Sequence, residues 1–252
     1  MNYFFSLTNN HLKSEITIPK FQNRGNYNKK LKIFSLKILN NNWIASKPVF
    51  NSDENFYYIK KDFNSKNEIF AMSEEDIENT KYNSLNFKNN FFSTSPAFRA
   101  NLRVINSAGG FSSYQSEYPS GMTQRKGNIL SQISSLLDPD NDKNILIFKN
   151  IYFEPIVKSF RVFIVDIENK EVVIENSFYT NSLNFWEIDK NFIKPSNFFF
   201  SEGYLGIPIY FSEKKNNISL EHTHPLQSYI MTPNMQKIIQ GLKKNVQTFI
   251  KR

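Results

Sequence analysis

The sequence predicts a mainly β protein: an antiparallel β-sandwich-like domain with one C-terminal amphipathic helix. Apolar and polar residues alternate with a period of two near residue 100, and short turn sequences separate two pairs of apolar runs. A sustained helical stripe of apolar residues occurs near the C-terminal end alone. Because helices do not alternate with strands, a doubly wound parallel sheet is disfavoured. The 252 residues contain no linker, so we expect a single domain over residues 1–252.

A half-buried strand is predicted over residues 97–106. Its apolar face carries Phe98, Ala100, Leu102 and Val104, and its polar face carries Arg99, Asn101 and Arg103. Weaker strands are predicted over residues 31–39, 56–61, 145–149 and 151–153. The Asn run at 40–42 fits a turn after the first of these.

Two hairpins are predicted in the C-terminal half. The first joins residues 158–167 to 171–175 through Glu168-Asn169-Lys170. The second joins residues 206–211 to 218–224 through a turn rich in Lys and Asn. Pro208 has no N–H for a sheet ladder, so its strand is expected at an edge or at a bulge.

The C-terminal helix is predicted over residues 233–251, with Thr232 as its N-cap and Pro233 in its first turn. We expect its apolar stripe to pack on a sheet and to bury Ile238, Ile239, Leu242 and Val246. A basic amphipathic helix can also lie on a membrane, but packing on a sheet is the commoner use. Residues 128–137 predict a second, short helix, although their period is ambiguous.

The composition excludes several kinds of chemistry. There is no cysteine, so disulfides, cysteine-ligated zinc and thiol catalysis are ruled out. The first residues lack the basic and apolar regions of a signal peptide, and no stretch reaches the roughly 18 apolar residues of a membrane helix. We therefore expect a soluble cytoplasmic protein without a membrane span.

The net charge of +8 is a weak signal for nucleic-acid binding. Lys outnumbers Arg 25 to 6, and the lysines are scattered, as codon bias in an AT-rich genome produces. A phosphate-binding surface usually gathers Lys and Arg in one stripe. Nucleic acid is therefore disfavoured as a partner.

Residue types that are scarce in this chain gather in residues 97–127. This segment holds three of the five Ala, three of the six Arg and four of the eight Gly. Gly109-Gly110 predicts a tight turn after the strand, and a polar loop is expected over residues 112–118. The segment contains neither GxxxxGK[ST] nor GxGxxG, so it is not a phosphate loop.

Tyr, Gln, Glu and Arg side chains at this density suit a ligand rich in hydroxyl groups, through bidentate hydrogen bonds and ring stacking. The predicted ligand-binding residues are Arg99, Arg103, Tyr114, Gln115, Tyr118 and Arg125. The alternative is a well-ordered loop whose side chains satisfy its own backbone. No cofactor is expected in either case.

A second unusual run is Glu221-His222-Thr223-His224-Pro225, which holds two of the three histidines. On a strand, the two imidazoles point to the same side and offer two ligands to one metal. No acid follows Glu221 to complete such a site, so we expect no metal. For an enzyme acting by general acid–base or metal-assisted chemistry, the candidate catalytic residues are Glu117, Glu221, His222 and His224.

Three functions stay open at this point. We favour a soluble protein that binds a carbohydrate or a similar polar ligand through residues 112–125. The first alternative is a His-dependent hydrolase that uses residues 221–224. The second is a structural or assembly subunit, including a homo-oligomer, without a small-molecule site. We also expect residues 112–125 and 221–224 to share one cleft, since two clusters of scarce residues in one domain more often serve one site than two.

Overall fold

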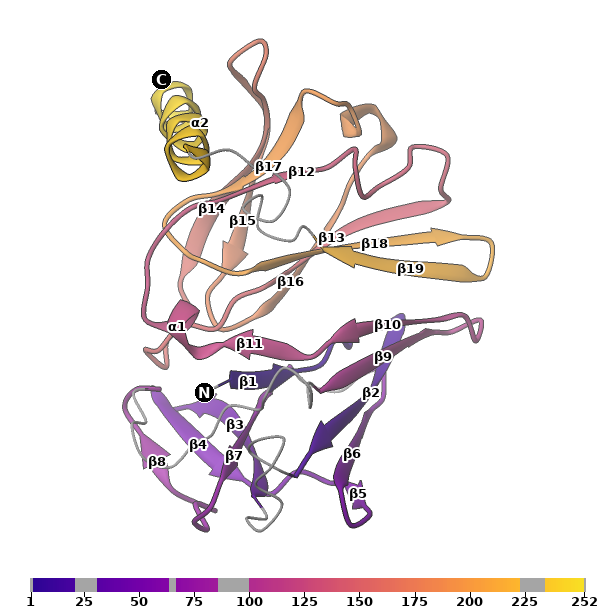
Figure 1. Ribbon diagram of the computed structural model, residues 1–252, viewed down its shortest axis with the longest axis vertical. Helices are drawn as coiled ribbons and strands as arrows, with labels where there is room; N and C mark the ends of the chain where they lie inside the picture. Colours follow the sequence, from indigo (N-terminus) through magenta and orange to yellow (C-terminus); the bar gives the residue numbers. More distant parts are fainter. Residues whose placement is uncertain (1, 21–30, 64–66, 86–99, 223–233, 252) are drawn as a thin grey trace. The chain divides into compact units, whose positions relative to one another are not determined.

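The computed structural model describes residues 2–20, 31–63, 67–85, 100–222 and 234–251 (Figure 1). Antiparallel sheets and a C-terminal helix confirm the mainly β prediction. The strands are distributed over four sheets, not over the two sheets of a single sandwich, because the chain gathers into two compact units. Unit 1 comprises residues 1–124, 151–157 and 216–218, and unit 2 comprises residues 125–150, 158–215 and 219–252. The expectation of one domain over residues 1–252 stays a prediction.

Unit 1 contains a six-stranded and a five-stranded sheet. The six-stranded sheet has the order β11-β1-β7-β3-β4-β8, with strands Glu117–Pro119, Asn2–Phe5, Ile69–Ser73, Lys32–Leu39, Asn42–Ser46 and Lys81–Tyr82. The five-stranded sheet has the order β10-β9-β2-β6-β5, with strands Phe111–Gln115, Asn101–Asn106, Leu12–Pro19, Phe56–Lys61 and Asn51–Ser52. A single helical turn, α1 (Ser120–Thr123), follows β11.

Three strands of unit 1 confirm sequence predictions: β3, β6 and β9 lie within the segments 31–39, 56–61 and 97–106. The turn between β3 and β4 places Asn40 and Asn41 at φ values of 50° and 56°. Asn tolerates this left-handed conformation, which a two-residue hairpin turn requires. Gly109 has φ 88° in the turn after β9, as the Gly pair predicted.

A buried carboxylate ties the two sheets of unit 1 together. Glu68, just before β7, is buried, and one of its oxygens lies 2.6 Å from the ammonium of Lys37 on β3. Its other oxygen pairs with Lys61 on β6, in the five-stranded sheet. The Lys61 ammonium also lies 5.5 Å from the centre of the Phe70 ring. An unpaired charge would be costly to bury, so the paired lysines are what allow a carboxylate at this position.

Unit 2 contains two four-stranded sheets and the C-terminal helix. The first sheet has the order β12-β17-β14-β15, with strands Ile129–Gln132, Asn197–Ser201, Ser159–Asp166 and Glu171–Tyr179. The second has the order β16-β13-β18-β19, with strands Leu183–Glu187, Lys143–Lys149, Ile207–Lys214 and Asn217–His222. The helix α2 spans Met235–Ile250, and a 3-10 turn, η2, spans Lys190–Phe192. Both predicted hairpins, β14–β15 and β18–β19, are present, and β13 covers the predicted strand 145–149.

The strand β14 is buried on both faces from Val162 onward, which explains the continuous apolar run of this part of its sequence. Its alternate residues join two different apolar clusters. One cluster lies between the two four-stranded sheets and includes Phe160, Val162, Ile164, Phe148, Phe178 and Phe199. The other lies under the helix and includes Phe163, Val165, Leu130, Phe200, Val246 and Ile250. The helix therefore packs on the sheet, as its apolar stripe predicted.

A scarce glycine is required by this core. A Cβ atom added to Gly206 would lie 2.3 Å from Cζ of Phe148. The Phe148 ring is itself fixed by three neighbouring rings, with centroid distances of 6.1 Å to Phe160, 5.7 Å to Phe178 and 5.5 Å to Phe199. The aromatic packing leaves no room for a larger residue at position 206.

Several local predictions are wrong. Residues 128–137 do not form a helix, because β12 pairs with β17 and this pairing outweighs an ambiguous local period. Residues 151–153 form no strand. Pro208 does not mark an edge strand, since β18 lies between β13 and β19. Pro208 is tolerated at the second position of β18, close to the start of the strand.

The helix prediction is correct in type, but only one of the four side chains expected in the core is fully buried. Val246 is buried, Ile239 and Leu242 are partly buried, and Ile238 is 45% exposed. At about 100° per residue, Ile238 lies roughly 80° from Val246 around the helix axis, at the margin of the stripe. Thr232 and Pro233 lie outside the described residues, and Asn234 occupies the described N-cap without a side-chain capping bond.

Replacing Val246 with Ala should lower the free energy of unfolding by about 1–3 kcal/mol, because it removes buried methyl groups between the helix and the sheet. The matched change Ile238→Ala should cost less than about 0.5 kcal/mol, because that side chain is largely exposed. Urea denaturation of both variants measures the difference. Equal losses would show that the helix does not pack through Val246.

Replacing Lys61 with Met should lower the free energy of unfolding by about 2–4 kcal/mol, because Glu68 would keep only its bond to Lys37. The double change Lys61→Met with Glu68→Leu should cost less than Lys61→Met alone, since no buried charge is then left uncompensated. Denaturation curves of the single and double variants give their free energies of unfolding and show which variant is the more stable. A double variant less stable than the single one would contradict it.

Candidate functional site: the outer face of the five-stranded sheet

The segment predicted as a polar loop is built from strands. β10 pairs with β9 across the Gly109-Gly110 turn, and β11 pairs with β1. These pairings give residues 111–119 the alternation of a strand, so neighbouring side chains point to opposite faces. Ser113 and Gln115 are exposed, whereas Ser116 is buried. The polar composition of the segment is therefore divided between the core and the surface.

Of the predicted ligand-binding residues, Tyr118 is buried in the core of unit 1 and Tyr114 is partly buried beside it. The Tyr114 ring lies 6.5 Å from the Phe5 ring, and burial raises the pKa of the Tyr114 hydroxyl. Tyr118 is fully buried, and burial raises the pKa of its hydroxyl too. Both hydroxyls therefore stay protonated at neutral pH.

The predicted catalytic residues lie in different units. Glu117 of unit 1 accepts a hydrogen bond from the backbone N–H of Ala100 at 3.4 Å, just before β9. Glu221 and His222 belong to unit 2 and end β19. His224 and Arg99 lie outside the described residues, and Arg125 is an exposed residue at the start of unit 2. The shared cleft stays a prediction.

No metal centre is visible in the part of the chain that the structure describes: its His, Asp and Glu residues form no group of three that could hold an ion. The metal-assisted alternative depends on His224 as well as His222, so it stays a hypothesis.

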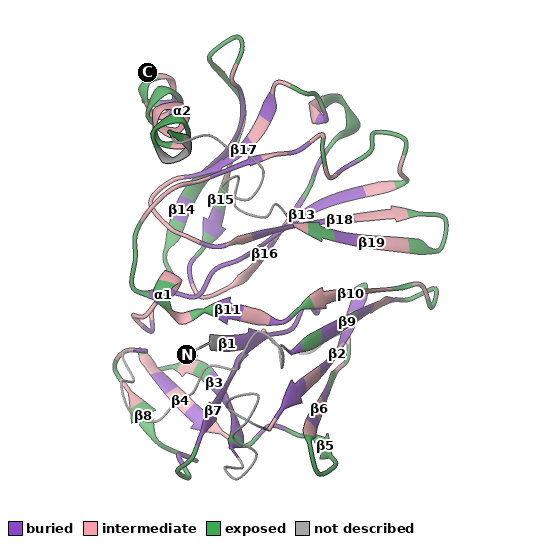
Figure 2. Cartoon of the chain, in the orientation of Figure 1, coloured by how far each residue is buried: buried purple, intermediate pink, exposed green. Residues whose placement is uncertain are grey.

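Arg103 and Gln115 lie on the same side of the five-stranded sheet, the exposed side, in neighbouring positions of the strand register. We call this side the outer face. The strands of this sheet, β10, β9, β2, β6 and β5, are labelled in Figures 1 and 2. The inward residues that alternate with it, such as Ile16, Ile59 and Leu102, are buried. The strand register arranges the outer face in three rows: Phe111–Ile105–Lys13, then Ser113–Arg103–Glu15–Lys60, then Gln115–Asn101–Thr17–Tyr58.

Glu15 is at the centre of the middle row and pairs with a cation on each side. One oxygen lies 3.4 Å from Nζ of Lys60, and the other lies 3.5 Å from Nη1 of Arg103. The Arg103 guanidinium also lies 4.3 Å from the centre of the Phe111 ring. These exposed pairs contribute little to stability, but they orient the guanidinium over the sheet.

Tyr58 is held in place at the end of the third row. Its hydroxyl donates a 2.5 Å hydrogen bond to Oδ2 of Asp53. Oδ1 of Asp53 accepts bonds from the backbone N–H groups of Asn55 and Phe56, each at 2.8 Å. The bond from Tyr58, followed by the two backbone bonds, lowers the pKa of Asp53, and the bond to Asp53 raises the pKa of Tyr58.

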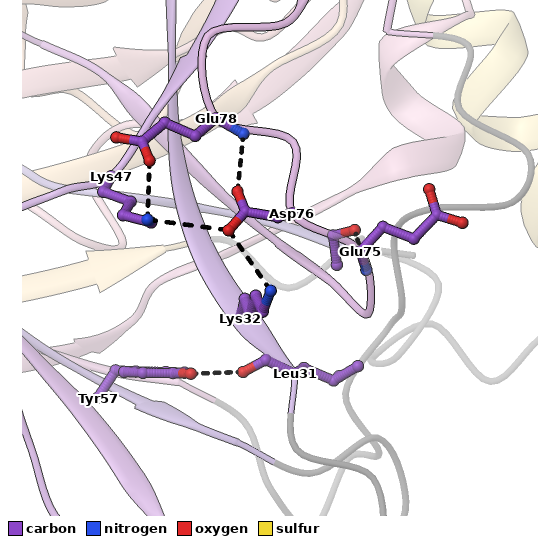
Figure 3. A network of polar contacts seen from close by, with 8 residues as sticks. Leu31, Lys32, Lys47, Tyr57, Glu75, Asp76 and Glu78 are labelled. Atoms are coloured by element: carbon purple, nitrogen blue, oxygen red, sulfur yellow. Dashed lines mark hydrogen bonds and ion pairs between the residues drawn. The ribbon is translucent and has the colours of Figure 1, made fainter.

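A second polar cluster fixes the turn after β7 (Figure 3). Asp76 accepts a bond from the backbone N–H of Glu78 and lies 3.5 Å from Nζ of Lys32. Lys47 lies 2.7 Å from Glu78 and 3.8 Å from Asp76. Lys32 and Lys47 thus pair with the carboxylates of this turn. The hydrogen bond that the backbone N–H of Glu78 donates to Asp76 is the main cause of the lowered pKa of Asp76. The arrangement serves to connect strands β3, β4 and β7.

Sequence reasoning missed Glu15, Thr17, Tyr58 and Lys60. The run LKSEITIP at residues 12–19 alternates apolar and polar residues, which is the signal that could have identified β2. Tyr58 and Lys60 lie within a segment that was predicted as a strand, but their place beside Thr17 and Glu15 depends on strand register.

Replacing Asp53 with Asn should lower the pKa of Tyr58 towards its usual value near 10, because the charged acceptor is lost. The lowered pKa of Asp53 means that its contribution to folding is present above about pH 4 and is lost as the pH falls through the folded-state pKa. NMR titration of ¹³C-labelled tyrosines measures the first effect. An unchanged Tyr58 titration would show that the bond to Asp53 does not form in solution.

Comparison with known proteins gives no relative from which to take a function: no family model, curated protein or solved structure matches the chain. Within the described residues, no helix has the length and apolar character needed to cross a bilayer. A functional hypothesis therefore has to come from the surfaces of this chain itself.

Proposed function

We propose that the protein binds a carbohydrate through the outer face of the five-stranded sheet. The observation that carries this proposal is the side-by-side arrangement of Gln115, Asn101, Thr17 and Tyr58 next to the Arg103–Glu15–Lys60 row. Amide and hydroxyl groups both donate and accept hydrogen bonds, as sugar hydroxyls do. An aromatic ring at the edge of such a row offers an apolar surface with a polar tip.

The position of Glu15 favours a sugar over a nucleic acid. A phosphate backbone would meet a carboxylate at the centre of the face, where a nucleic-acid-binding sheet usually presents cations and stacking aromatics. A sugar hydroxyl can instead donate to that carboxylate. Lys60 and Arg103, one on each side of Glu15, hold its carboxylate in place as an acceptor.

The bonds around Tyr58 and Arg103 support a preorganised surface. Asp53 fixes the Tyr58 hydroxyl, and Phe111 and Glu15 fix the Arg103 guanidinium. Side chains that already occupy their bound positions lose less conformational entropy when a ligand binds. Short β-strands also supply a more rigid support than a loop would.

The variants Tyr58→Ala and Gln115→Ala should each weaken oligosaccharide binding by about three- to tenfold, because a stacked ring or a hydrogen bond contributes about 1 kcal/mol. Gln240→Ala is the matched control, since Gln240 is an exposed residue of α2 in unit 2. A panel of oligosaccharides is screened on the wild-type protein, and affinities of the best ligand are then measured by calorimetry.

Folding of each variant is checked by its melting temperature. The proposal is wrong if the folded wild-type protein binds no oligosaccharide of the panel. It is also wrong if binding is unchanged in both outer-face variants.

A further inference from the structure

The outer face carries more positive than negative charge. The three rows carry Lys13, Lys60 and Arg103 against the carboxylate of Glu15, and Asp53 adds a second carboxylate where it binds the Tyr58 hydroxyl, so the cations still outnumber the carboxylates by three to two. Both oxygens of Glu15 are already paired, one with Lys60 and one with Arg103. A neutral sugar would leave this excess of cations uncompensated, whereas a ligand with an acidic group would neutralise part of it.

The guanidinium of Arg103 is well placed to receive an acidic group. Its contact with Glu15 is through Nη1, and in the described part of the chain Glu15 is its only ionic partner. The guanidinium also lies over the Phe111 ring, 4.3 Å from its centre, so it has contacts with both Phe111 and Glu15 that restrict its movement. A guanidinium edge matches the two oxygens of a carboxylate through parallel hydrogen bonds.

A second cation lies beside Arg103 on the same face. Lys13 is opposite Ile105, two residues along β9 from Arg103, so the two cations are diagonal neighbours across β2 and β9. Diagonal neighbours are about 7–8 Å apart, within reach of long side chains. The Lys13 ammonium lies 6.0 Å from the centre of the Phe63 ring. One corner of the outer face is therefore cationic and contains Arg103, Lys13 and Phe111. It lies next to the row of Gln115, Asn101, Thr17 and Tyr58, whose amide and hydroxyl groups suit sugar hydroxyls.

We propose that the carbohydrate bound by the outer face is a carboxylated one, a chain that contains uronic acid, with its carboxylate at the corner of Arg103 and Lys13. The inference rests on the proposed function and names the ligand class for that site. A singly charged planar carboxylate fits one guanidinium. A densely sulfated or phosphorylated ligand would need more arginines and would be repelled more strongly by Glu15.

The experiment compares an oligosaccharide of galacturonic acid with its fully methyl-esterified form, which has the same hydroxyls but no carboxylate charge. Calorimetry at low and at physiological salt gives both affinities for the wild-type protein, for Arg103→Gln and for Lys244→Gln. Lys244 is an exposed residue of α2, so its variant loses the same charge at a distant position. A sulfated oligosaccharide is the third probe.

The acidic form should bind the wild-type protein at least about tenfold more tightly than the ester, because a charge-assisted bidentate pair is lost on esterification. The difference should fall to about threefold or less in Arg103→Gln and should persist in Lys244→Gln. Added salt should weaken the acidic form more than the ester. Arg103→Lys, which keeps the charge without the planar fork, should keep only part of the difference.

Equal affinities for acid and ester would overturn the inference while leaving the proposed carbohydrate site intact. Tighter binding of the sulfated probe than of the carboxylated one would also overturn it. If Arg103→Gln still binds the acidic oligosaccharide about tenfold more tightly than the ester, the carboxylate of the ligand binds elsewhere on the protein. That result would contradict its assignment to the corner of Arg103 and Lys13. If neither form nor any neutral oligosaccharide binds, the proposed function itself fails.

Discussion

The two-residue repeat of β-strands is the constraint on which the candidate site depends. In β2, β6 and β9, one set of side chains is buried in the core of unit 1, so the alternate set has to face outward, and in β10 the alternate residues are partly buried and exposed in turn. The register then decides which outward residues become neighbours across strands. A shift by one residue in any of these strands would place polar side chains in the core, so burial of the apolar set specifies the register.

Ionic and hydrogen-bonded contacts then fix the details of this arrangement. The buried Glu68, paired with Lys61 and Lys37, links β6 of the five-stranded sheet to β3 of the six-stranded sheet. On the other side of β6, Asp53 orients Tyr58. β6 therefore carries both a structural contact on its inner side and a candidate binding contact on its outer side. Such a division of roles is natural in a strand, where adjacent residues never share a face.

Much of the fold could be predicted from the sequence because its signals are local. Alternating residues identified β9, and turn residues between apolar runs identified the hairpin β14–β15. The C-terminal helix followed from its apolar stripe, although Ile238 at the margin of the stripe is exposed. The distribution of strands over four sheets could not be predicted, since strand order depends on pairings between residues far apart in the chain.

The candidate site was only partly predictable for the same reason. Arg103 and Gln115 were identified from a segment enriched in scarce residues, but Tyr118 from that segment is buried in the core and Tyr114 is partly buried. Composition indicates that a segment is unusual, while the face on which each side chain lies depends on strand pairing. Glu15 is more than 80 residues from Arg103 in the sequence, and only the pairing of β2 with β9 makes them neighbours.

Ligand-induced NMR shifts would show most directly whether the outer face binds an oligosaccharide, because they report which residues the bound ligand contacts. We expect the largest changes at backbone amides of β2, β6, β9 and β10, with Arg103, Thr17 and Tyr58 among them. Changes confined to α2, or to the residues around His222, would contradict a binding site on the outer face of the five-stranded sheet.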